Sequence, residues 1–170
     1  MPAATKTANI LRAGEEFGNG FLILDKGTDE GIAEGDIVVT SERILVGTVQ
    51  ETGKGFSKVA LAMNPGQAYD GEILPLGVHT LLRGLGAGTF SLGLIPGDRI
   101  VRRGDLVRVS VIGISEEILA AEVANVKTPG GGGAFQEIYA LALADPARLN
   151  VVLIIQKTVI PVSGSPSRMP

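Results

Sequence analysis

The chain has 170 residues, of which 45% are hydrophobic and 19% charged, a composition typical of folded globular proteins. Its net charge of −3 argues against a nucleic-acid partner, and the absence of cysteine excludes disulfides and thiolate metal sites. The 24 glycines and 9 prolines, with only 4% aromatic residues, predict short apolar strands separated by many reversals. The sequence therefore indicates an all-β fold.

Residues 1–20 are predicted to form a lead-in segment with a first strand at residues 8–12. No apolar core of a signal peptide is found in residues 1–13. The longest apolar runs, such as residues 151–155, fall far short of the roughly 18–20 residues that span a bilayer. We expect no membrane-spanning segment in this chain, which we interpret as the exported part of a longer protein.

A stretch at residues 24–39 has a glycine at every fourth position between two apolar runs, residues 21–24 and 37–39. These glycines are Gly27, Gly31 and Gly35. Glycine adopts the positive φ angles that tight reversals need, and the flanking runs contain β-branched and aromatic residues. The stretch therefore predicts a strand, a compact turn and a second strand.

Further apolar runs separated by turn residues predict strands at residues 44–50, 57–63, 71–76, 78–83, 89–94 and 149–156. The glycines of residues 84–88 are spaced Gly-x-Gly-x-Gly and are followed by a strand pattern. A dinucleotide-binding loop instead has Gly-x-Gly-x-x-Gly before a helix, so we predict a hairpin loop. A second hairpin tip is predicted at residues 130–133.

Segments of the first half return in the same order in the second half. Residues 32–38 match 101–107, residues 44–49 match 118–123, and residues 56–65 match 135–146. Two similar β units in tandem, closed to hide their sheet edges, account for this pattern. We predict a first barrel-like subdomain at residues 21–77, a second at 78–157 and a tail at 158–170, with an exchange of strands between the subdomains left open.

Residues 115–127 give conflicting signals. Their alanines, the serine at the start and the acidic first turn favour a helix by local propensity. The duplication instead pairs residues 118–126 with the strand predicted at 44–50. We predict a strand, with a helical turn only at residues 115–117.

Residue types that support catalysis are scarce. His79 is the only histidine, and no serine lies in a nucleophile elbow of the Gly-x-Ser-x-Gly kind. The serines considered are Ser41, Ser57, Ser91 and Ser110. The acidic residues of the stretch 24–39 do not follow the order of a calcium-binding EF-hand loop. We therefore predict no catalytic residue, cofactor or metal site.

Four motifs follow one another along the chain. They are the stretch 24–40 with Leu-Val-Gly-Thr-Val at 45–49, Leu-Arg-Gly-Leu-Gly-Ala-Gly at 82–88, Val-Arg-Arg-Gly-Asp-Leu-Val at 101–107, and the closing segment 135–149. In this order they resemble the extracytoplasmic domain of the MreC family of bacterial rod-shape-determining proteins, over residues 8–156. Residues 112–117 depart from the family pattern, which has a glycine- and proline-rich loop there.

The resemblance implies two tandem β-barrel-like subdomains, arranged as in chymotrypsin-type proteases but without catalysis. It also implies a scaffold of the cell-wall elongation machinery in the periplasm. Members of the family are anchored to the cytoplasmic membrane by an N-terminal helix. Residues 1–13 contain no apolar span that could form this helix. The implied partners are a class B penicillin-binding transpeptidase, MreD, RodA and MreB, together with self-association as a homodimer.

Two other functions stay open: a degenerate double-barrel serine hydrolase that uses His79, and a peptidoglycan-binding module, for which few aromatic residues are available. For protein binding we expect an edge strand at residues 78–82, the glycine loop at 84–88 and the basic stretch 99–108. The candidate contact residues are Val78, Leu82, Gly84, Gly86, Gly88, Arg99, Arg102 and Arg103.

Overall fold

A computed structural model of the chain describes residues 4–127 and 134–157. The described residues form twelve strands and two short 3-10 helices, so the all-β prediction is confirmed. The hairpin tip predicted at 130–133 and the tail predicted at 158–170 lie outside the described residues.

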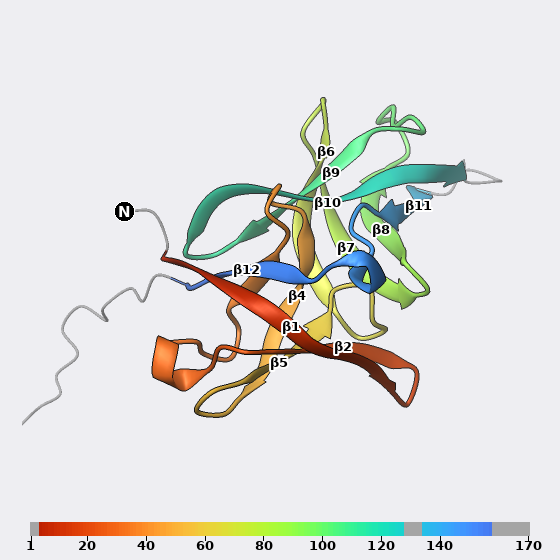
Figure 1. Cartoon of the computed structure of the whole chain (residues 1–170). Helices are drawn as coiled ribbons and strands as arrows, with labels where there is room; N and C mark the ends of the chain where they lie inside the picture. The colour runs from red at the N-terminus through yellow and green to blue at the C-terminus, as the bar shows by residue number, and fades with distance from the viewer. Residues whose placement is uncertain (1–3, 128–133, 158–170) are drawn as a thin grey trace, which may run out of the picture.

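The strands of the first half are β1 (Thr5–Glu16), β2 (Asn19–Leu24), β3 (Ile37–Val39), β4 (Leu45–Thr52), β5 (Ser57–Leu61) and β6 (Ala68–Leu74). Those of the second half are β7 (Val78–Gly86), β8 (Thr89–Pro96), β9 (Leu106–Val111), β10 (Ile114–Lys127), β11 (Phe135–Ala142) and β12 (Val151–Ile155). The 3-10 helices are η1 (Thr28–Glu30), inside the glycine-punctuated stretch, and η2 (Pro146–Arg148), which precedes β12. Figure 1 shows their arrangement.

The strands close into two barrels. The first has the order β1-β12-β3-β4-β5-β2 and the second the order β10-β11-β8-β7-β6-β9. The prediction of two barrels in tandem is therefore confirmed. Closure gives each strand a neighbour on both sides for at least part of its length, which is how antiparallel sheets limit exposed edges.

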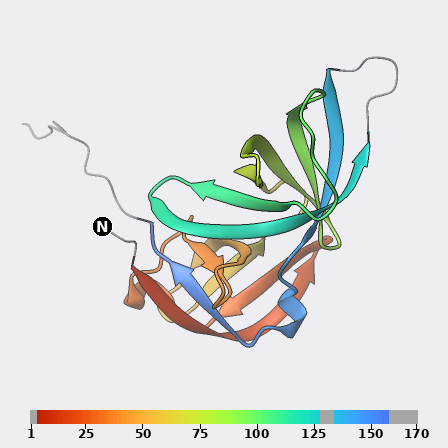
Figure 2. The same ribbon diagram turned by 90° about the horizontal axis from the view of Figure 1, so that it is seen from above.

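Each half of the chain gives its last strand to the other barrel. β6 follows β5 along the chain but pairs with β7 and β9 of the second barrel. β12 follows β11 but pairs with β1 and β3 of the first, so that its blue ribbon lies among red and orange strands in Figure 2. With these two strands exchanged, the pairing pattern of β1–β6 is the same as that of β7–β12.

This exchange changes how the predicted boundaries are understood. The boundary between residues 77 and 78 separates the two copies in the sequence, but both β6 and β7 lie in the second barrel. β1 is not a lead-in, since it is a full strand of the first barrel that pairs with β12 and β2. The sequence repeat could locate the copies, whereas strand pairing decides which barrel each strand completes.

Corresponding turns before β3 and β9 confirm the duplication at atomic detail. The Oδ2 atom of Asp36 accepts a hydrogen bond from the backbone N–H of Ala33 at 2.9 Å. The Oδ2 atom of Asp105 accepts one from the N–H of Arg102, also at 2.9 Å. Each turn contains a glycine with positive φ, Gly35 (93°) and Gly104 (95°). The same aspartate therefore closes the same turn in both copies.

The segment with conflicting signals is a strand throughout. β10 runs unbroken from Ile114 to Lys127, so the strand prediction is confirmed and the helical turn predicted at residues 115–117 is wrong. β10 pairs with β9 on one side and β11 on the other. β9 pairs with Ile114 and with residues 118–122, and β11 pairs with residues 121–127. This tertiary pairing overrides the local helix propensity.

Two strands of the first barrel are buried on both faces. Val38 of β3 and Ile154 of β12 point into the core of the first barrel. Ile37 of β3 and Ile155 of β12 instead join the hydrophobic cluster that fills the second barrel. The unbroken apolar runs at 37–39 and 151–155 therefore reflect strands that form both a barrel wall and the contact between the barrels.

We predict that Ile154→Ala lowers the free energy of unfolding by about 2–5 kcal/mol, because it leaves a cavity in the first barrel and weakens an exchanged strand. Val151→Ala is the matched control, since Val151 is on the same strand but 46% exposed. Its cost should stay under about 1 kcal/mol. Urea unfolding of both variants measures these values, and equal losses would contradict the burial pattern.

Candidate interaction surface

The predicted edge strand is an inner strand. β7 pairs with β6 on one side and with β8 on the other, and Val78 and Leu82 are buried in the core of the second barrel. The prediction of a free edge at residues 78–82 is therefore wrong. Barrel closure removes the edge, and neither side chain is available to a partner in the folded chain.

The glycine loop is a hairpin, as predicted. Gly86, Ala87 and Gly88 have φ angles of 87°, 53° and 74° in the turn between β7 and β8. Gly84 has a separate role, because a Cβ atom there would lie 2.2 Å from the backbone oxygen of Asn64. This glycine lets the chain segment Met63–Gln67 lie directly against β7.

The predicted arginines lie between β8 and β9, and they are exposed: Arg99, Arg102 and Arg103. In the described part of the chain, none of them forms an ion pair. Arg108 differs, because its Nη2 atom lies 2.6 Å from Glu72 and its Nη1 atom 2.9 Å from Glu117. The hydrogen bond from Arg108 holds the pKa of Glu72 below its ordinary value. Arg108 is thus paired with two carboxylates of its own barrel, whereas the other three arginines are exposed.

An apolar hollow of about 290 Å³ lies beside the arginines. Leu76 and Ile100 line it with exposed fractions of 63% and 65%, together with Pro75. Arg102 and Asp105 complete its rim. Two large, exposed apolar side chains in one hollow with charges at its edge form the kind of patch that binds proteins.

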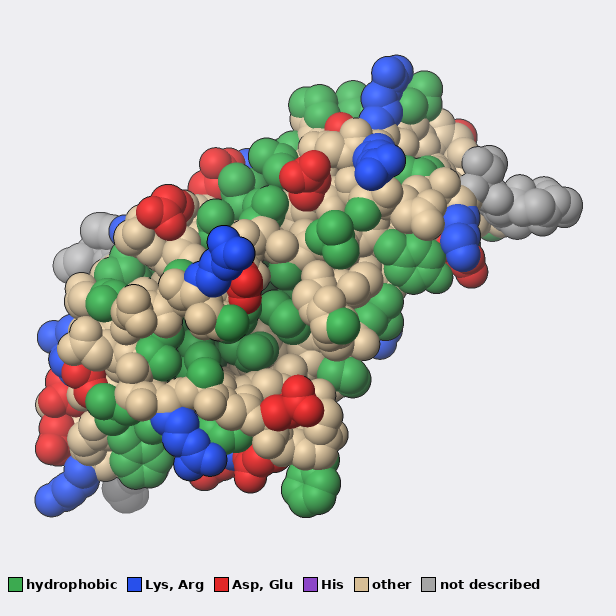
Figure 3. Space-filling model, turned by 45° about the vertical axis from the view of Figure 1, so that its right-hand side comes forward, with side chains coloured by type: hydrophobic (Ala, Val, Ile, Leu, Met, Phe, Trp, Pro, Cys, Tyr) green, Lys and Arg blue, Asp and Glu red, His purple; other side chains and the backbone are tan. Residues whose placement is uncertain are grey.

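A larger groove of about 480 Å³ lies between the two barrels. Its walls are the β1–β2 hairpin, the β7–β8 hairpin and η2, and Leu61 and Met63 are among its apolar lining. Its charged lining residues, Glu15 and Asp145, are both acidic. Figure 3 shows this side of the molecule, where hydrophobic side chains gather in a hollow at the middle of the face.

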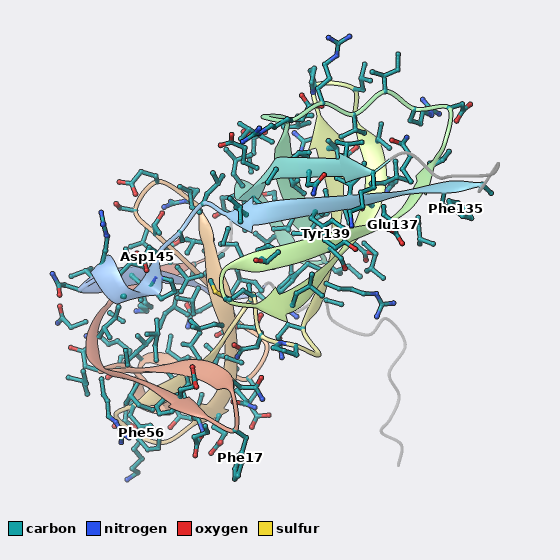
Figure 4. All side chains as sticks on the ribbon, turned by 90° about the vertical axis from the view of Figure 1, so that its right-hand side faces the viewer. Phe17, Phe56, Phe135, Glu137, Tyr139 and Asp145 are labelled. Atoms are coloured by element: carbon teal, nitrogen blue, oxygen red, sulfur yellow. The ribbon has the colours of Figure 1, made fainter. Side chains whose placement is uncertain are left out.

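Phe17 stands at the tip of the β1–β2 hairpin next to this groove. Its side chain is fully exposed and points away from the molecule, as Figure 4 shows. Its φ of 52° is in the left-handed region that bulky residues avoid. The sequence placed this residue in the predicted lead-in segment, after the first strand, and it was not among the predicted contact residues. An aromatic residue directly before glycine in a hairpin turn is the signal that was available.

His79 is not part of a catalytic arrangement in the described residues. It is exposed on β7 and faces Glu72 across the pairing with β6. No hydrogen bond joins it to a serine or a carboxylate within the described ranges. Ser57, whose buried Oγ atom lacks a hydrogen-bond partner, belongs to β5 of the first barrel.

The acidic residues of the stretch 24–39 are used within the turns. Asp25 accepts hydrogen bonds from the side chain and backbone of Asn9, both at 2.8 Å, and these hold its pKa below the ordinary value. Glu30 accepts one from the N–H of Gly27 at 2.7 Å. Within residues 4–127 and 134–157, His, Asp and Glu form no group of three that could hold a metal ion.

Comparison with known proteins identifies the double barrel. A protein family described as "Rod shape-determining protein MreC, barrel core" matches residues 10–156. The chain belongs to this family. No curated protein matches the sequence at a significant level.

Solved MreC structures share the fold. MreC from Pseudomonas aeruginosa is 20% identical, with a TM-score of 0.81 over 89% of this chain and 99% of that one. MreC from Listeria monocytogenes is 19% identical, with a TM-score of 0.80 over 95% and 79%. MreC from Helicobacter pylori, in a complex with the penicillin-binding protein PBP2, is 17% identical, with a TM-score of 0.67 over 91% and 99%.

None of the helices within the described residues has the length and apolar character needed to cross a membrane. The elements that build the MreC barrel core here are strands, with η1 and η2 of three residues each. The surface of this core is therefore formed by the hairpins, the turns and the outer faces of the barrels.

We predict that Phe17→Asn stabilises the fold by about 0.5–1 kcal/mol, because asparagine tolerates positive φ and Asn-Gly is a preferred hairpin turn. Replacing a buried aromatic side chain by a smaller one would instead lower the free energy of unfolding by several kcal/mol. Thermal unfolding followed by circular dichroism measures the difference. A clear loss of stability would show that the Phe17 ring packs against the fold.

Proposed function

We propose that this chain is a non-catalytic scaffold of the machinery that elongates the bacterial cell wall and determines rod shape. The observation that carries the proposal is the match of residues 10–156 to the MreC barrel core. Its place would be the periplasm, because the family to which it belongs includes proteins solved as a "major periplasmic domain". We also propose that a further segment of the protein anchors this chain to the cytoplasmic membrane.

A class B penicillin-binding transpeptidase is the partner we propose first. Its support is the solved complex of PBP2 with the Helicobacter pylori relative, which has the same fold. Two surfaces of this chain suit a protein partner, the apolar hollow beside Ile100 and the groove between the barrels. Binding to MreD, RodA and MreB, and self-association as a homodimer, rest on the family resemblance alone.

The exposed residues of this chain fit protein binding better than they fit hydrolase activity or sugar binding. His79 lies on the outside of a barrel without a serine partner among the described residues, which offers no support for a hydrolase. Sugar binding by stacking needs aromatic rings that face one ligand. The exposed rings of Phe17 and Phe56 lie on the first barrel, whereas Phe135 lies at the far end of the second (Figure 4).

The proposal is tested by titrating the purified chain against the extracytoplasmic part of a class B penicillin-binding protein from the same bacterium. We expect saturable binding with a dissociation constant in the micromolar range or tighter, as transient scaffold contacts show. A chymotrypsin whose catalytic serine is replaced supplies a double-barrel control and should not bind. Absence of binding by the chain would contradict the partner proposal.

A further inference from the structure

The outer edge of β1 is unpaired over half its length. β12 covers β1 only at residues 5–9, and the N–H of Ile10 makes one further bond to the backbone oxygen of Asn150. Beyond this point, residues 12–16 pair only with β2, and Leu11 lies at an irregularity in that pairing. In a fold that otherwise closes its sheets, this is a free strand edge.

Hairpin geometry shows which backbone groups are free. β1 and β2 are joined by a two-residue turn, and Glu16 pairs with Asn19 to close it. The closing pair of such a hairpin is hydrogen-bonded and the pairs alternate from there, so the N–H and C=O groups of Ala13 and Glu15 point away from β2. In the described structure these groups have no hydrogen-bond partner, and both residues line the groove between the barrels.

The second barrel shows what covers the corresponding edge. There the hairpin strand is β7, and the outer side of its last residues is bonded by the turn segment that connects β5 to β6. The N–H of Gly84 donates to the oxygen of Gln67 at 2.9 Å, and the N–H of Gly86 to that of Met63 at 2.7 Å. In the first barrel the corresponding segment forms η2 instead, and the edge beyond Ile10 stays open. The occupant that this site fits is therefore a chain segment that offers backbone hydrogen-bonding groups, as residues 63–67 do for β7.

The side chains of the groove define the occupant further. Leu61 and Met63 offer apolar surface to alternate side chains of an added strand. Glu15 and Asp145 are the charged residues of the groove. Asp145 is paired with Arg148 at 3.5 Å, whereas Glu15 forms no ion pair within the described residues. A lysine or arginine on the occupant would neutralise Glu15. A second copy of this chain fits less well, because its own β1 edge presents the same acidic Glu15 and no basic residue of the groove.

We propose that the free edge of β1 at residues 12–16 binds an extended segment of the protein partner as an added β-strand, with a basic side chain facing Glu15. Strand addition gains affinity from main-chain hydrogen bonds and specificity from the side chains that alternate into pockets. The inference rests on the proposed function and specifies where and how the partner binds. The exposed Phe17 at the tip of the same hairpin would extend the contact.

Two variants test the edge against the extracytoplasmic part of the class B penicillin-binding protein. Ala13→Pro removes a free N–H without removing a bond to β2, and it should weaken binding at least about tenfold through the loss of strand hydrogen bonds. Ala13→Ser keeps the N–H and should bind as the unchanged chain does. Glu15→Lys should weaken binding similarly by repelling a basic side chain, whereas Glu34→Lys, exposed outside the groove, should not.

Hydrogen–deuterium exchange provides a readout independent of mutation. The amides of Ala13 and Glu15 should exchange rapidly in the free chain and become protected in the complex. If the unchanged chain fails to bind, the partner proposal falls and this inference falls with it. If the chain binds but both edge variants bind equally well and neither amide is protected, the inference alone is overturned. Loss of self-association in Ala13→Pro, measured by sedimentation, would identify a second copy as the occupant and also overturn it.

Discussion

The exchange of β6 and β12 is the constraint on which the rest of the structure depends. Each barrel is closed by a strand that belongs, in sequence order, to the other copy. The hydrogen-bond ladders of the two barrels are therefore linked through the chain, and neither copy can complete a barrel from its own strands. β3 and β12 then pack between the barrels with both faces buried, which fixes the two barrels against each other.

A fixed pair of barrels creates a surface that neither barrel has alone. The groove is lined by hairpins from both barrels and by η2, so its shape depends on their relative position. The direct contact between barrels is polar as well as apolar. The Tyr69 hydroxyl on β6 lies 2.6 Å from the Thr48 hydroxyl on β4, and burial raises the pKa of this tyrosine. A preformed groove of this kind would cost a protein partner less free energy to bind than a flexible one.

The two copies share the turn that precedes β3 and β9 but differ in how the outer edges of β1 and β7 are covered. Asp36 and Asp105 hold the same turn in both, which is why the duplication was readable in the sequence. The segments after β5 and β11 have diverged, however, and they cover β7 in one barrel and leave part of β1 open in the other. A difference at a sheet edge changes which backbone groups are free to form hydrogen bonds, without changing the barrel core.

Sequence patterns predicted the strands and the two barrels because alternation, glycine turns and the repeat all reflect local or repeated chemistry. They failed where pairing between distant segments decides the outcome. Val78 was interpreted as an edge residue, although β6 and β8 enclose its strand. Residues 115–117 were interpreted as a helical turn, although they belong to the strand β10. Of the predicted contact residues, the arginines are exposed, and their role in binding stays a prediction.

The most direct test of the strand exchange is urea unfolding followed by hydrogen exchange at amides of β4 in the first barrel and β8 in the second. Because each barrel holds a strand of the other copy, both sets of amides should lose protection at the same urea concentration, in one cooperative transition. Loss of protection in one barrel while the other stays folded would contradict the account.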